Sequence, residues 1–107
     1  MISIVIPTFN ELQNIIPLIK NLIVLVSDFE YEIIVIDDDS PDGTSDEVNK
    51  YMKLNKRIKL ITRIGRSGLS SAIKEGLIFS QGKYILVLDG DGQHHPSFVL
   101  DLSLIHI

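Results

Sequence analysis

The sequence contains no cysteine, which excludes a disulfide framework and any metal site built on thiolates. Basic residues are few: 10 Lys and Arg stand against 14 Asp and Glu, and the net charge of −4 argues against broad nucleic-acid binding. The most apolar helical stretch, residues 15–26, contains Pro17 and Lys20 and is too short to cross a bilayer. The N-terminus lacks the basic segment and cleavage pattern of a signal peptide. We therefore expect a cytoplasmic protein with no nucleic-acid partner.

What is present is the pattern of an α/β fold. With 107 residues, 45% of them hydrophobic and 22% charged, the chain has room for one folded domain or part of one. Short apolar runs alternate with helical periodicity, which predicts a parallel sheet with right-handed crossovers and helices on both faces. The expected strands are residues 2–6, 31–36, 58–61 and 84–88, and the expected helices span about 12–27, 40–54 and 68–80.

Local signals predict where the first two helices begin. Thr8 and Glu11 have the spacing of a capping box, in which each side chain bonds the backbone of the other residue. Ser40 followed by Pro41 predicts an N-cap and the first helical residue of the second helix.

Residues 84–96 organise the chain, because a buried apolar run there ends abruptly in carboxylates. Asp89, Asp91 and Gln93 offer hard oxygen ligands at alternate positions, which suits Mg²⁺ or Mn²⁺. Gly90 leaves room for phosphate groups to approach the backbone. The alternative interpretation of this stretch is an acidic turn at the end of a strand, with glycine present for its geometry.

Two further loops, residues 7–11 and 37–40, also follow predicted strands and carry polar side chains. Ligands of open α/β sheets bind just beyond the carboxyl ends of the strands. We therefore expect these loops and residues 89–93 to converge on one site.

Four segments of the chain carry motifs in a fixed order: residues 4–11, 35–44, 68–72 and 89–96. Together they resemble family 2 glycosyltransferases, which have the Rossmann-like GT-A nucleotide-sugar-binding fold. The Ser-Pro-Asp-Gly-Thr sequence at 40–44 is typical of dolichyl-phosphate mannose synthases and polyprenyl-phosphate glycosyltransferases. Any one motif is weak evidence, but four in the same order are specific.

The resemblance covers residues 1–101, which we expect to be the N-terminal, nucleotide-sugar-binding half of a longer glycosyltransferase domain. Residues 102–107 do not match the expected continuation and resemble a translated sequencing adapter, so we expect a non-native tail. The chain alone is expected to lack transferase activity, because the acceptor half is missing.

The resemblance also implies roles for individual residues. Asp37 would recognise the nucleobase, in a pocket lined by Val35. The implied nucleotide-sugar-binding residues are Pro7, Phe9, Glu11, Val35, Asp37, Asp89, Gly90 and Asp91. Asp89, Asp91 and Gln93 would hold Mg²⁺ or Mn²⁺. Asp89 and Asp91 are the implied catalytic residues, because the metal stabilises the diphosphate leaving group.

The implied reaction is the transfer of a hexose, mannose or glucose, from a GDP- or UDP-sugar to a polyprenyl or dolichyl phosphate. It would take place at the cytoplasmic face of a membrane, with which the full-length protein would associate. Alternatives are a polysaccharide, protein or other lipid acceptor, and a non-catalytic nucleotide-binding module. A dinucleotide oxidoreductase is disfavoured, because no Gly-x-Gly-x-x-Gly follows the first strand.

The sequence departs from the family pattern at two positions. Phe9 replaces the usual Tyr, which loses a hydroxyl contact but keeps an aromatic ring for stacking. Asp39 replaces the usual Gly in a turn that favours positive φ, which Asp tolerates better than most residues. Two loop arginines, Arg63 and Arg66, could meet a diphosphate or remain solvated.

Overall fold

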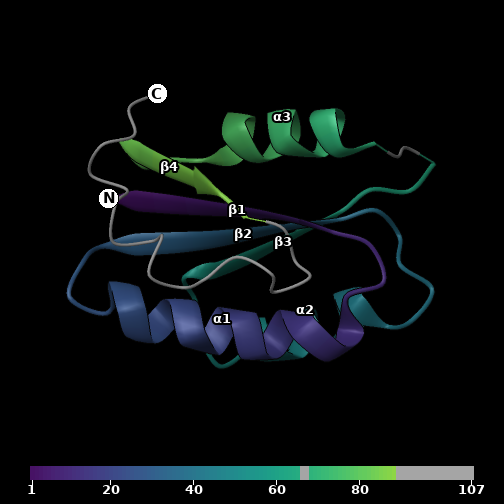
Figure 1. Cartoon of the computed structure of the whole chain (residues 1–107), viewed down its shortest axis with the longest axis horizontal. Coiled ribbons are helices and arrows are strands. Elements are labelled where there is room, and N and C mark those ends of the chain that lie inside the picture. Colours follow the sequence, from purple (N-terminus) through teal and green to yellow (C-terminus); the bar gives the residue numbers. More distant parts are fainter. Residues whose placement is uncertain (66–67, 89–107) are drawn as a thin grey trace.

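A computed structural model describes residues 1–65 and 68–88. In this part of the chain, four parallel strands form one sheet in the order β3-β2-β1-β4. Figure 1 shows α3 on one face of the sheet and α1 with α2 on the other. The elements are β1 (Ile2–Thr8), α1 (Leu12–Val26), β2 (Tyr31–Asp37), α2 (Thr44–Met52), β3 (Ile58–Thr62), α3 (Leu69–Phe79) and β4 (Tyr84–Val87). The predicted parallel α/β fold is confirmed.

The central strands β1 and β2 are buried along their whole length because helices cover both faces. Successive side chains alternate between two cores. Ile4 and Ile6 belong to the core beneath α1, whereas Val5 belongs to the smaller core that contains Ala72 of α3. Helix α3 approaches β1 closely, because a Cβ added at Gly76 would clash with the Val5 side chain.

Strand β1 is longer than predicted, because it continues through Pro7 to Thr8. Val5 accepts a hydrogen bond from the Leu88 N–H on the β4 side, and residues two apart in a strand bond in the same direction. The nitrogen of Pro7 therefore faces the β4 side, and β4 already ends at Val87, opposite Val5. Proline at this position therefore removes no donor from the ladder between β1 and β2.

The predicted capping box at the start of α1 is wrong. Thr8 is still in β1, and its hydroxyl donates to Asp37, 2.8 Å away. The α1 N-cap is Glu11, which makes no side-chain cap bond. Because β1 extends two residues beyond the predicted strand, Thr8 belongs to the strand and does not cap the helix.

The predicted start of α2 is also wrong. Its N-cap is Gly43, at φ 93°, and the helix begins at Thr44 rather than at Pro41. Asp39, just upstream, has φ 55°, so the expectation of a left-handed turn at this position is confirmed. Two left-handed residues bend the chain before the helix can begin, which leaves Ser40 free to bond elsewhere.

A polar cluster lies on the α3 face of the sheet, near the amino-terminal ends of β1 and β2. Glu32 accepts hydrogen bonds from Ser3 Oγ, the Gln81 N–H and Lys59 Nζ, each 2.6 Å long, and Ser3 accepts from the Gly82 N–H at 2.8 Å. Burial of Glu32 disfavours its charged form, but the bonds from Lys59, Ser3 and Gln81 together outweigh burial and lower the pKa of its carboxyl. This cluster fastens the α3–β4 connection to β1 and β2.

Across residues 1–65 and 68–88, every helix is too short or too polar to cross a membrane.

Candidate functional site

The carboxyl ends of three strands meet at one edge of the sheet. Thr8 at the end of β1 lies opposite Asp37 at the end of β2. Leu88 follows β4, and its N–H donates to the Val5 carbonyl at 3.0 Å. The predicted convergence of the loops after β1 and β2 is confirmed. The third loop, with Asp89, Gly90, Asp91 and Gln93, lies outside the described residues.

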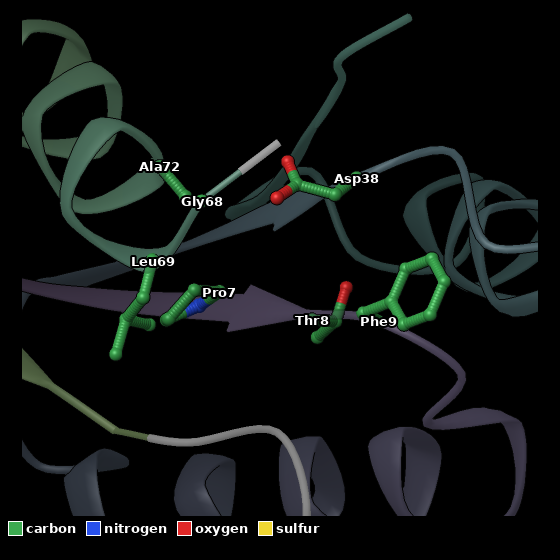
Figure 2. A pocket seen from close by; sticks show the side chains of 7 residues that line it. All are labelled: Pro7, Thr8, Phe9, Asp38, Gly68, Leu69 and Ala72. Carbon is green, nitrogen blue, oxygen red and sulfur yellow. The ribbon is translucent and has the colours of Figure 1, made fainter. Parts of the chain in front are cut away.

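A cavity of about 320 Å³ opens at this edge, between the ends of β1 and β2 and the start of α3. Among the described residues, most of the lining side chains are apolar, and Asp38 supplies the one ionisable group, as Figure 2 shows. The lining residues are Pro7, Thr8, Phe9, Asp38, Gly68, Leu69 and Ala72. This volume lies at the small end of the range of about 300–1,000 Å³ for small-molecule sites. An apolar cavity with a carboxylate in its lining suits an apolar group that carries N–H donors.

Asp37 connects the elements around the cavity without facing it. Its carboxylate is fully buried and accepts four hydrogen bonds: from Thr8 Oγ1, from the backbone N–H and Oγ of Ser40, and from Ser45 Oγ at 2.9 Å. The bond from Ser40 Oγ is 2.6 Å long. Asp37 therefore fixes the end of β1 and the start of α2 relative to β2.

The β2–α2 loop supplies the caps that α1 lacks. The backbone N–H groups of Asn10, Glu11 and Leu12 donate to Ser40 Oγ, Thr44 Oγ1 and Asp42 Oδ2 respectively, at 2.8–3.1 Å. These donors have no partner within the helix, so the loop satisfies them from a distant part of the sequence. The loops that border the cavity are thus fixed to each other.

Hydrogen bonds from the Thr44 hydroxyl and from the N–H groups of Leu12 and Thr44 lower the pKa of Asp42, against the effect of burial. This carboxylate stays ionised at neutral pH, which strengthens the bonds that it accepts at the start of α1.

Arg63 forms an ion pair with Asp38 and does not itself line the cavity. Arg63 Nε and Nη2 donate to the two Asp38 carboxylate oxygens at 2.6 and 3.0 Å, in the forked geometry of a bidentate pair. The same guanidinium donates to the Gly68 carbonyl at 3.0 Å and to Ser71 Oγ at 2.8 Å. The bond to Asp38 raises the pKa of Arg63 above its ordinary value, although burial acts in the opposite direction. The predicted solvation of Arg63 is wrong, because its side chain is fully buried. Arg66 lies outside the described residues.

The sequence of residues 3–103 matches the model of the family "Glycosyl transferase family 2". The chain belongs to this family. It is 36% identical over 98 residues to a dolichol-phosphate mannosyltransferase from Pyrococcus furiosus, an alignment that covers 92% of this chain and 28% of that protein. The chain spans 28–38% of the length of three dolichol-phosphate mannosyltransferases that it matches.

Solved structures agree with the fold. TarS from Staphylococcus aureus in complex with UDP-GlcNAc superposes with a TM-score of 0.76 at 26% identity, over 96% of this chain and 30% of TarS. A mannosyltransferase from Pyrobaculum calidifontis, in complex with GDP-Man and Mn²⁺, gives a TM-score of 0.70 at 24% identity, over 84% and 27% of the two chains.

Within this glycosyltransferase fold, the predicted site residues divide into two groups. Pro7 and Phe9 line the cavity, and Phe9 is 56% exposed. Glu11, Val35 and Asp37 are absent from the lining. Val35 is buried in the core beneath α1, and Glu11 Oε2 accepts from the Asn14 amide at 3.3 Å. Direct nucleotide contacts of these three residues stay predictions.

Sequence reasoning missed most of the α3 wall. Gly68, Leu69 and Ala72 belong to a family motif, but no role was assigned to them. Asp38 was likewise assigned no binding role. The alternation of side chains along a strand could have identified it. Asp37 ends a buried strand and Asp38 follows directly, so the two side chains point to opposite sides of the sheet.

The predicted metal ligands Asp89, Asp91 and Gln93 cannot be placed, because all three lie beyond Leu88. Within residues 1–65 and 68–88, no group of three or more His, Asp or Glu side chains is arranged to hold a metal ion. The donor set of two carboxylates and an amide oxygen matches Mg²⁺ or Mn²⁺ chemistry.

Proposed function

We propose that this chain binds the nucleotide part of a sugar donor in the cavity beside Asp38. The observation that carries the proposal is an apolar cavity at the carboxyl ends of the parallel strands. Its lining includes the carboxylate of Asp38, which Arg63 orients, and the exposed aromatic residue Phe9. The Phe9 ring is placed to stack on a base, and the carboxylate of Asp38 accepts N–H donors from the edge of the base. Asp37 and Glu11 support this site from the neighbouring loops.

The proposed reaction is the transfer of mannose or glucose from a GDP- or UDP-sugar to a polyprenyl or dolichyl phosphate, at the cytoplasmic face of a membrane. Its support is the 36% identity to a dolichol-phosphate mannosyltransferase. The donor base is left open, because the related structures contain GDP-Man in one case and UDP-GlcNAc in the other. Asp89, Asp91 and Gln93 are the proposed ligands of Mg²⁺ or Mn²⁺, which would offset the diphosphate charge.

Calorimetric titration of GDP and UDP, each with Mn²⁺ and with EDTA, tests the proposal on this chain without an acceptor. We expect binding that requires metal and is lost in Asp91→Ala. The control is Asp28→Ala, which removes an exposed carboxylate from the α1–β2 turn at the opposite edge of the sheet. Absence of binding by a folded chain would refute the nucleotide site.

The stacking role of Phe9 has its own test. Phe9→Ala should weaken binding of the preferred nucleotide about tenfold or more, because base–aromatic stacking contributes roughly 1–3 kcal/mol. Phe9→Tyr should keep or improve the affinity, because the ring is retained. Equal affinity of all three proteins would show that the base does not contact this ring.

A further inference from the structure

Arg63 is the largest fully buried side chain among the described residues, and its burial requires an explanation. A buried guanidinium is costly unless it is paired and hydrogen-bonded. Arg63 follows β3, and its N–H donates to the Asp37 carbonyl at 2.8 Å, which anchors its backbone at the edge of the sheet. Its side chain then runs between Asp38 and the start of α3.

The four hydrogen bonds of the guanidinium divide between two walls of the cavity. Two go to the carboxylate of Asp38, on the β2 side. The other two go to the Gly68 carbonyl and to Ser71 Oγ, on the α3 side. Ser71 Oγ also donates to the Gly68 carbonyl at 3.1 Å, which closes a ring of bonds at the first turn of α3. One side chain therefore sets the relative position of the two walls.

Arg63 itself is not placed to touch a ligand. Its side chain has 0% exposure, and it does not line the cavity, whereas Asp38 does and retains 12% exposure. Arg63 can therefore act on a bound nucleotide by orienting Asp38 and the start of α3, and replacing it with lysine tests this role while the positive charge is kept.

We propose that Arg63 is a positioning residue for the nucleotide site, which it preorganises by orienting the Asp38 carboxylate and fixing the α3 wall. This inference rests on the nucleotide site proposed above. Preorganised contacts bind more tightly, because the side chain does not lose freedom when the ligand arrives. Lysine cannot replace Arg63, since it lacks the planar fork that bonds Asp38 and Gly68 together.

A double-mutant cycle on nucleotide affinity tests the proposal. The four proteins are the unaltered chain, Arg63→Lys, Asp38→Asn and the double variant, titrated with GDP and UDP in the presence of Mn²⁺. Each single change should weaken binding about tenfold, and the double change should weaken it by about the same factor rather than by a hundredfold, because coupled residues are not additive. A role limited to stability would not produce this non-additivity in affinity.

The matched control is Glu32→Gln. This change alters the carboxylate of the second ion pair on the α3 face of the sheet, which joins Glu32 to Lys59 of β3. It should lower stability and leave affinity unchanged. If Arg63→Lys does not fold, Ser71→Ala replaces it in the cycle, because this change removes one α3-side partner of the guanidinium and keeps the ion pair.

The outcomes separate the two proposals. If the unaltered folded chain binds neither nucleotide, the nucleotide site fails and the role of Arg63 fails with it. If the unaltered chain binds but Arg63→Lys binds equally well, or the cycle is additive, the inference about Arg63 alone is overturned. A loss of affinity in Glu32→Gln as large as in Arg63→Lys would also overturn it.

Discussion

Two ion pairs lie on the α3 face of the same sheet, and they are built differently. Each joins a carboxylate from β2 or its end to a base from β3 or its end: Glu32 with Lys59, and Asp38 with Arg63. The Lys59 side chain is 42% exposed and makes one bond to the carboxylate. The Arg63 side chain is fully buried and makes two, with two more to α3.

The difference teaches where rigidity is concentrated. At Glu32, the backbone N–H of Gln81 and the Ser3 hydroxyl share the charge, so the lysine is one partner among several. At Asp38, the described hydrogen bonds to the carboxylate come from Arg63 alone. The Asp38 carboxylate at the cavity is therefore held by one residue, whereas the Glu32 carboxylate at the opposite end of the sheet is held by three.

The largest expected effect is from Arg63→Ala, which leaves the Asp38 carboxylate without its partner. Breaking a buried pair in this way costs about 3–5 kcal/mol. The free energy of unfolding, measured in urea by circular dichroism, should fall by that amount or the protein should fail to fold. A loss below about 1 kcal/mol would mean that the pair is not buried as described.

Reciprocal conservative substitutions sharpen the comparison. Arg63→Lys should lower the free energy of unfolding by about 1–3 kcal/mol, because the fork and its bonds to α3 are lost. Lys59→Arg should stay within about 0.5 kcal/mol of the unaltered protein, because a half-exposed ammonium is easily replaced. Similar effects of the two changes in urea unfolding would contradict the distinction between the two pairs.

An effect smaller than that of Arg63→Lys is expected at Glu32, as a pH dependence. The pKa of Glu32 is lowered in the folded protein, so its stabilisation is present above the ordinary Glu pKa and is lost as the pH falls through the lowered value. Glu32→Gln should cost about 1 kcal/mol at pH 7, and the gap between the two proteins should close in acid. Comparing the two acid unfolding curves cancels the contribution of the other carboxylates. Parallel curves would exclude this role of Glu32.

Much of the fold was predictable from sequence, because apolar runs and helical periodicity depend on neighbours along the chain. The strand cores near Ile4, Ile34 and Ile85 follow from these patterns alone. The capping of α1 was predicted wrongly, because its caps come from residues about 30 positions away. No local motif records such a partner.

The candidate site was predictable in its location but not in its contacts. The strand-end rule placed it at the carboxyl edge of the sheet, and Pro7 and Phe9 line the cavity there. The burial of Arg63 could not be predicted, because a loop arginine is usually solvated and its partners lie on two other elements. Which carboxylate faces the cavity depends on where β2 ends, and a one-residue shift exchanges Asp37 with Asp38.

The borrowed caps of α1 have a consequence for synthesis on the ribosome. Asn10 is translated 30 residues before Ser40, whose hydroxyl accepts its N–H. At about 5–20 residues per second, the start of α1 waits roughly 2–6 seconds for its partners to be made. During that interval the start of α1 lacks these caps. The same delay separates the two segments when they leave the ribosome, so α1 is exposed to chaperones and proteases without its caps until the β2–α2 loop has also emerged.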